Sequence, residues 1–243
     1  MDELVDFRDP VVKKIEQSLR LGASLYIASL IKGPRYAGKK SMCRRLFASM
    51  KHVDAEDESR VRKMLESEQE LMIFDLHKLK NPLSLDLSGK KIIATTANDL
   101  PADFEERFAY IYTMPPLPER PDDVELFTDH FAKKAKKTFM LEEDTKISIE
   151  DLDLSENFHS LISSIFREVS IKSCTMKDIQ RALYLKFSKN MKGNNFYKES
   201  LGIFEKPLLR AGLAKYGSQL KLANILGINR NTLRKKINEY DIR

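Results

Sequence analysis

The sequence predicts an α/β domain built on a parallel sheet, followed by a helical subdomain and a small all-α domain at the C-terminus. Short apolar runs alternate with helical patterns up to about residue 118, as in a parallel sheet covered by helices. Beyond "MPPLPERPDD" the apolar runs stop and helical patterns continue. The last part of the chain carries its excess positive charge.

Composition limits the class of protein. The chain has 243 residues, enough for two domains, with 42% apolar and 32% charged residues, as in soluble proteins. No apolar run approaches the ~20 residues of a membrane helix, and the N-terminus lacks the pattern of a signal peptide. Cys43 and Cys174 are too few for a disulfide framework or a zinc ribbon. We therefore expect a cytoplasmic protein with no membrane segment and no metal site.

The α/β domain is expected over residues 1–118. "DPVVKKIEQSLRLG" has helical spacing, and "SLYIASLIKG" is an apolar run ending in glycine, as in buried strands of parallel sheets. A helix is expected over about residues 39–50 and another over "DESRVRKMLESEQE". "LMIF" and "KKIIATTA" are two further apolar runs, which we interpret as strands.

The helical subdomain is expected over residues 119–192, with helices at 122–137, 156–170 and 175–191. The polar sequence "KGNN" predicts a flexible joint before a C-terminal domain at 198–243.

The C-terminal domain has the spacing of a helix-turn-helix. "FEKPLLRAGLAKYG" predicts one amphipathic helix, and Ser218 is a suitable N-cap for a second. Ala223 is small where two helices approach, Gly227 suits the turn four residues later, and Leu233 anchors a third helix. The third helix, "NRNTLRKKINEY", would then be the recognition helix.

The charge of this domain supports nucleic-acid binding. Residues 205–243 carry nine Lys or Arg against three Asp or Glu, which equals the net charge of +6 of the whole chain. Such a block indicates a polyanion partner, although a helical bundle with a basic surface is the alternative. Arginine can bind guanine and asparagine can bind adenine, while threonine and lysine can bind phosphates.

Residues 204–243 resemble the C-terminal half of Fis and the DNA-binding tails of NtrC-type enhancer-binding proteins. "GINRNTLRKK" is close to the signature of that family. The resemblance implies binding to double-stranded DNA as a homodimer. The expected DNA-binding residues are Ser218, Lys221, Asn229, Arg230, Asn231, Thr232, Arg234, Lys235 and Lys236. The expected dimer interface comprises Phe204, Leu208, Leu209 and Leu213.

The rest of the chain resembles the AAA+ domain of the same family. "PPLPERPDDVELFTDHFAKK" is similar to the segment that opens its lid, "KKIIATTANDL" to its sensor strand, and "GPRYAGKKS" fits the phosphate loop. The resemblance implies a vestigial site for ATP or ADP with Mg²⁺. The residues expected there are Gly33, Gly38, Lys39, Lys40, Ser41, Asp75, Arg107 and Lys177.

Several catalytic groups of that family are missing. Leu76 follows Asp75 where the catalytic carboxylate belongs, and Ala97 aligns with the sensor asparagine, although Asn98 is adjacent. Arg107 resembles one trans-acting arginine, and the other has no counterpart. The short interval between Lys39 and Asp75 lacks the loop that contacts sigma-54, and no receiver domain is expected before the AAA+ region.

We therefore expect a DNA-binding transcriptional regulator without ATPase activity, whose degenerate AAA+ domain serves as a scaffold, an assembly module or a ligand sensor. One alternative is an active ATPase that remodels sigma-54 polymerase, and another is a Fis-like architectural protein that bends DNA. Further candidate partners are RNA polymerase or a signalling protein. Association with the nucleoid would follow from DNA binding.

Overall fold

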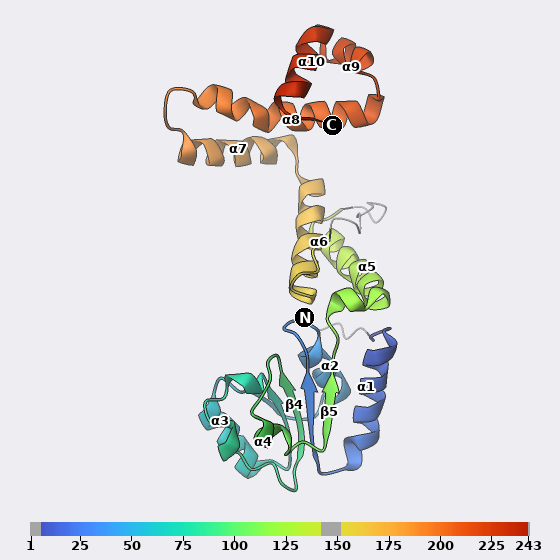
Figure 1. Ribbon diagram of the computed structural model, residues 1–243, viewed down its shortest axis with the longest axis vertical. Helices are drawn as coiled ribbons and strands as arrows, with labels where there is room; N and C mark the ends of the chain where they lie inside the picture. Colours follow the sequence, from blue (N-terminus) through green and yellow to red (C-terminus); the bar gives the residue numbers. More distant parts are fainter. Residues whose placement is uncertain (1–5, 142–151, 243) are drawn as a thin grey trace. The chain divides into compact units, whose positions relative to one another are not determined.

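The computed structural model describes residues 6–141 and 152–242. The chain divides into two compact units, Met1–Cys174 and Thr175–Arg243, and each is described here by itself. Figure 1 shows an α/β layer structure with further helices in the first unit and an all-helical second unit. The predicted α/β fold with a helical C-terminal domain is confirmed.

The centre of the first unit is a parallel sheet. Across residues 6–141, its strand order is β2-β3-β4-β1-β5, and each neighbouring pair is parallel. The strands are β1 (Ala28–Lys32), β2 (His52–Asp54), β3 (Glu70–Phe74), β4 (Lys91–Thr96) and β5 (Tyr110–Thr113). The three apolar runs interpreted as strands form β1, β3 and β4, the adjacent central strands. The edge strands β2 and β5 were not predicted.

Helices cover both faces of this sheet (Figure 1). The helices α1 (Pro10–Leu21) and α2 (Lys39–Leu46) pack on one face, where α1 contributes Val12, Ile15 and Leu19. On the other face α3 (Glu58–Ser67) and α4 (Ala102–Glu105) pack over alternate side chains of the same strands. Because the central strands are buried on both faces, they read as continuous apolar runs in the sequence.

The helices α5 (Pro121–Thr138) and α6 (Phe158–Ser173) complete the first unit. Phe127 and Phe131 of α5, with Leu161 and Ile165 of α6, extend the core that α1 and α2 form on the sheet. This part corresponds to the beginning of the predicted lid.

The second unit contains α7 (Met176–Asn190), α8 (Phe196–Tyr216), α9 (Gln219–Leu226) and α10 (Arg230–Glu239). Helices α7 and α8 form a hairpin (Figure 1), with the rings of Phe187 and Phe196 in edge contact at 5.7 Å. The core of this unit lies between α8, α9 and α10. It is formed by Leu209, Leu222, Ala223, Leu233, Ile237 and Ile242.

The grouping of α7 differs from the predicted lid boundary at residue 192. The two units divide after Cys174, so α7 belongs to the C-terminal unit. None of the α7 residues, all of which the structure describes, is buried. The helical pattern of α7 is plain in the sequence, but the pattern does not state which unit a helix joins.

In the parts of the chain described, residues 6–141 and 152–242, no helix has both the length and the apolar character needed to cross a lipid bilayer.

Candidate nucleic-acid interface and phosphate loop

The turn between α9 and α10 has the geometry that the sequence predicts. Gly227 ends α9 with φ of 66° in the left-handed region, and its N–H donates to the Ala223 carbonyl. Asn229 then caps α10, because its side-chain oxygen accepts a hydrogen bond of 2.8 Å from the Asn231 N–H. Leu233 and Ile237 of α10 are buried against α8 and α9. The core therefore fixes which face of α10 turns outward.

The outward face of α10 is basic and polar. Five residues predicted to contact DNA are exposed on or beside the first two turns: Arg230, Asn231, Thr232, Arg234 and Lys235. Lys221 of α9 is also exposed. Ser218 caps α9, accepting from the Lys221 N–H at 3.4 Å. The second unit thus presents cations and hydrogen-bonding groups on one short helix, as a major groove requires.

Lys236 differs from the prediction. Its Nζ lies 2.6 Å from Glu205 Oε1 of α8, and the other carboxylate oxygen accepts a 2.7 Å hydrogen bond from the Tyr240 hydroxyl. Hydrogen bonds from Lys236 and Tyr240 lower the pKa of Glu205, so the carboxylate stays charged and paired. In the free protein Lys236 is therefore part of the internal structure of the unit, and we predict that it stays paired with Glu205 when DNA binds.

The predicted dimer interface also changes. Leu209 is only 2% exposed and belongs to the core of its own unit, and Leu213 packs against that core. Phe204 is 66% exposed and Leu208 is 38% exposed. The long α8 has one apolar side for its own core and a second apolar region that remains open, and only Phe204 and Leu208 of the predicted four lie in the open region.

The phosphate loop lies between β1 and α2, as predicted. Gly33 has φ of 148°, and a Cβ there would lie 2.4 Å from the Met114 carbonyl oxygen, so a larger residue does not fit. Lys39 is the first residue of α2 and is buried. Its Nζ donates to the carbonyls of Gly33 and Pro34, both at 2.6 Å, and burial lowers its pKa to about 8. The lysine that would reach a phosphate is thus bonded to its own loop.

The remaining carbonyls of the loop are held by residues from the lid. Asn157 Nδ2 donates to the Arg35 carbonyl at 2.9 Å, and the Phe158 N–H donates to the Tyr36 carbonyl at 3.2 Å. Arg120 donates to the Ala37 carbonyl at 2.8 Å. The sequence did not single out Arg120 or Asn157, because nothing in the pattern of either segment shows that it contacts the loop.

Aromatic rings cover the beginning of α2. The ring of Phe7 and the ring of Phe158 would each lie 3.0 Å from a Cβ at Gly38. The guanidinium of Arg120 lies 5.8 Å from the Phe7 ring centroid and 5.6 Å from the Phe158 ring centroid. Arg120 is fully buried and also pairs with Asp123 at 3.3 Å. Side chains from the N-terminal segment and the lid therefore pack closely around the loop and the beginning of α2.

The groups around Asp75, which the resemblance places in the nucleotide site, are also paired. Asp75 follows β3 and lies 2.9 Å from Lys40 Nζ and 3.2 Å from Lys78 Nζ. Burial alone would raise the pKa of Asp75, but hydrogen bonds from these lysines outweigh it and lower that pKa. Leu76 is 1% exposed and packs in the core under the sheet. The Ala97 N–H donates to His77 Nδ1 at 3.2 Å.

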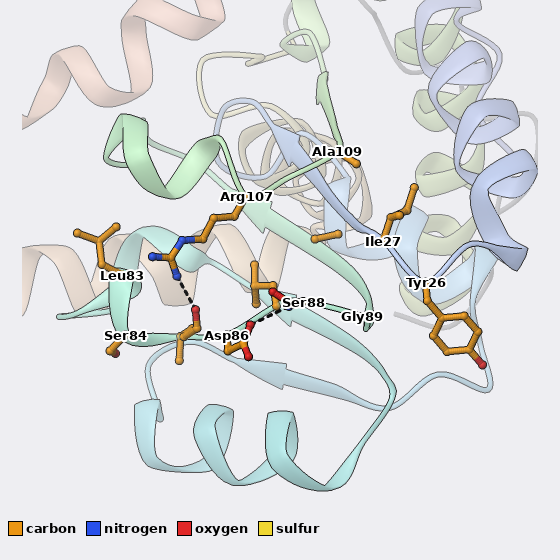
Figure 2. A pocket seen from close by; sticks show the side chains of 12 residues that line it. Tyr26, Ile27, Leu83, Ser84, Asp86, Ser88, Gly89, Arg107 and Ala109 are labelled. Atoms are coloured by element: carbon orange, nitrogen blue, oxygen red, sulfur yellow. Dashed lines mark hydrogen bonds between the residues drawn. The ribbon is translucent and has the colours of Figure 1, made fainter.

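The other residues predicted for the nucleotide site are Ser41, Arg107 and Lys177. Ser41 is exposed on α2, and Lys177 is on α7 of the second unit. Arg107 precedes β5, whereas the phosphate loop follows the carboxyl end of the parallel strand β1. Figure 2 shows Arg107 among the residues that line a pocket. Its Nη1 donates to the Leu85 carbonyl at 2.7 Å, and the pocket has a volume of about 560 Å³. Within one chain Arg107 and the loop are therefore at opposite ends of the sheet.

Helices of the C-terminal unit match a known protein family. Residues 200–240 match the family model "Bacterial regulatory protein, Fis family". The transcriptional regulator NtrC of Azospirillum brasilense is 49% identical over 53 residues, which cover 21% of this chain and 11% of that protein. NtrC of Rhizobium meliloti (strain 1021) is 38% identical over 71 residues, covering 29% and 15%. The match therefore spans a small part of the length of these relatives.

Solved structures extend the likeness to the fold of nearly the whole chain. NtrX from Brucella abortus covers 98% of this chain with a TM-score of 0.56 and 16% identity, over 69% of that structure. The same protein in complex with ATP gives a TM-score of 0.51 with 15% identity, again over 98% of this chain and 69% of the other. The chain is therefore similar in fold to NtrX, and its residues 200–240 are similar in sequence to the Fis family.

Proposed function

We propose that the protein is a transcriptional regulator that binds double-stranded DNA through α10. The observation that carries the proposal is the exposed face formed by Arg230, Arg234 and Lys235, opposite the buried Leu233 and Ile237. Arginine can donate two hydrogen bonds to guanine O6 and N7, which distinguishes one base pair from another. Lysine contacts to phosphates position the helix without reading sequence.

The proposed DNA-binding form is a homodimer. One helix-turn-helix reads few base pairs, and two-fold pairing places two recognition helices in successive major grooves. The exposed Phe204 and Leu208 on α8 support an interface there, since burying them against the same residues of a second copy removes apolar surface from water.

The experiment is a titration of variants against two duplexes, one obtained by selection for tight binding and one of random sequence. Arg230→Ala and Arg234→Ala should each weaken binding to the selected duplex by about 1–3 kcal/mol and binding to the random duplex by less. Arg210→Ala is the matched control, because Arg210 is an exposed arginine on α8. Unchanged affinity for both duplexes would refute the proposal.

We further propose that the AAA+ unit is a scaffold or a sensor that does not hydrolyse ATP. Two features support this: Leu76 is buried where a carboxylate would polarise water, and Lys39 is bonded to two loop carbonyls. The NtrX structures contain ATP or ADP, which makes a nucleotide the class of ligand to test for sensing. Binding would require Lys39 to leave the Gly33 and Pro34 carbonyls, so we expect weak affinity.

A further inference from the structure

Lys40 occupies an unexpected place next to the phosphate loop. In loops of the G-x-x-x-x-G-K-[ST] type, the residue after the lysine is a serine or threonine whose hydroxyl binds Mg²⁺, and Lys40 stands there in this chain. Its Nζ lies 2.7 Å from Asp54 Oδ1 and 2.9 Å from Asp75 Oδ2. The resemblance places Asp75 in the site for ATP or ADP with Mg²⁺. In this structure the Asp75 carboxylate forms an ion pair with the ammonium group of Lys40.

The two carboxylates come from neighbouring strands. Asp54 is the last residue of β2 and Asp75 follows β3, and these strands are paired in parallel with Asp54 opposite Phe74. The sheet therefore brings both carboxylates to the same edge, and the first turn of α2 places Lys40 between them. Burial alone would lower the pKa of Lys40, but the two carboxylates raise it, so the side chain stays charged at neutral pH.

A divalent ion does not fit this arrangement. Mg²⁺ requires close oxygen ligands at about 2.0–2.1 Å in octahedral geometry. The same oxygen of Asp75 that contacts Lys40 also lies 3.2 Å from Lys78 Nζ. A metal bound to that oxygen would meet two ammonium groups, and like charges at such distances repel strongly.

We propose that Lys40 is a built-in cation that replaces the divalent metal of the phosphate loop, so that the first unit neither requires nor binds Mg²⁺ at Asp75. A phosphate group approaching the beginning of α2 would then meet an ammonium in place of a metal ion. This inference goes beyond the proposed function and does not depend on DNA binding.

The first test is thermal unfolding of the full chain with EDTA or with millimolar Mg²⁺. The wild type should unfold at the same temperature in both. Lys40→Ala should unfold a few degrees lower in EDTA, because the carboxylates of Asp54 and Asp75 face each other without their cation, and Mg²⁺ should restore part of the loss. In Lys40→Ala with Lys78→Ala the recovery with Mg²⁺ should be larger.

The matched control is Lys51→Ala, which removes an exposed ion pair of 2.6 Å with Glu68 in the same unit. It should show no response to Mg²⁺. If Lys40→Ala unfolds as the wild type does and ignores Mg²⁺, or if Mg²⁺ stabilises the wild type through Asp75, the proposal is wrong.

A second measurement decides the matter even if Lys40→Ala does not fold. Mn²⁺ binding to the wild type can be followed by the loss of the free-ion electron paramagnetic resonance signal, with and without ATP. We expect the wild type and Asp75→Asn to reduce the free-ion signal of Mn²⁺ to the same extent. A stoichiometric site that disappears in Asp75→Asn would overturn the inference.

Discussion

Lys235 and Lys236 are adjacent on α10, but the fold gives them different surroundings. Lys235 is exposed, whereas Lys236 is half-buried and its Nζ lies 2.6 Å from Glu205 Oε1. We predict that Lys235→Ala weakens DNA binding through lost phosphate contacts. Lys236→Ala should leave the phosphate contacts unchanged and should destabilise the second unit.

The salt dependence of DNA binding gives the expected size of the Lys235→Ala effect. Each phosphate neutralised on duplex DNA contributes about 0.9 to the slope of log affinity against log salt concentration. The proposed dimer would lose the Lys235 contact twice, so the slope should fall in magnitude by about 1.8. The loss should be similar on specific and random duplexes, because phosphates carry no sequence information. For Lys236→Ala we expect the wild-type slope and about 1 kcal/mol less stability, the upper part of the range for surface ion pairs.

Fluorescence anisotropy of labelled duplexes at several salt concentrations measures the slope, and thermal unfolding measures the stability. Equal reductions of slope in both variants would mean that Lys236 leaves Glu205 when DNA binds, which would refute the assignment made from the free structure. Wild-type slopes in both variants would remove Lys235 from the interface as well.

Three further predictions concern catalysis, assembly and pH. Phosphate release from ATP should stay at background with and without DNA, because the buried Leu76 cannot polarise water; DNA-stimulated release that Lys39→Ala abolishes would contradict this. Phe204→Glu should convert dimers to monomers in sedimentation, while Leu220→Glu, an exposed position on α9, should not; a Phe204→Glu dimer would place the interface elsewhere. Lys236 and Tyr240 hold the folded pKa of Glu205 below its unfolded value, so the stabilisation is present above the unfolded pKa and is lost as pH falls through the folded pKa. The difference in melting temperature between wild type and Glu205→Gln should therefore vanish in acid; a difference independent of pH would show that the ion pair contributes nothing.

Local patterns predicted the helix-turn-helix well. Ala223, Gly227 and Leu233 are close in sequence, and their roles depend on helix geometry and turn conformation, which short-range rules describe. The sequence could not show that Lys236 pairs with Glu205, because the two residues are far apart in the chain and the surface of α10 is rich in cations. Leu209 was misplaced for a related reason: helical spacing indicates a buried face but not the partner that buries it.

The strands of the sheet could also be predicted only in part from the sequence. Strands β1, β3 and β4 were predicted because burial on both faces produces uninterrupted apolar runs. The edge strands β2 and β5 are short and partly exposed, so "HVD" and "YIYT" carry little of that signal. The position of the phosphate loop between β1 and α2 was predicted correctly. The contact of Lys40 with Asp54 was missed, because it depends on which strands lie next to each other.

The way in which the lid holds the phosphate loop has a consequence for how such domains diverge. Arg120, Asn157 and the Phe158 N–H all bond to main-chain carbonyls of residues 35–37. Every amino acid has a main-chain carbonyl, so substitutions along the loop can accumulate during evolution without removing the acceptors of these hydrogen bonds. The donors have no such freedom, because a guanidinium and a carboxamide are required at two of the three positions. In a collection of homologues, Arg120 and Asn157 should therefore vary less than the exposed Arg35 and Tyr36.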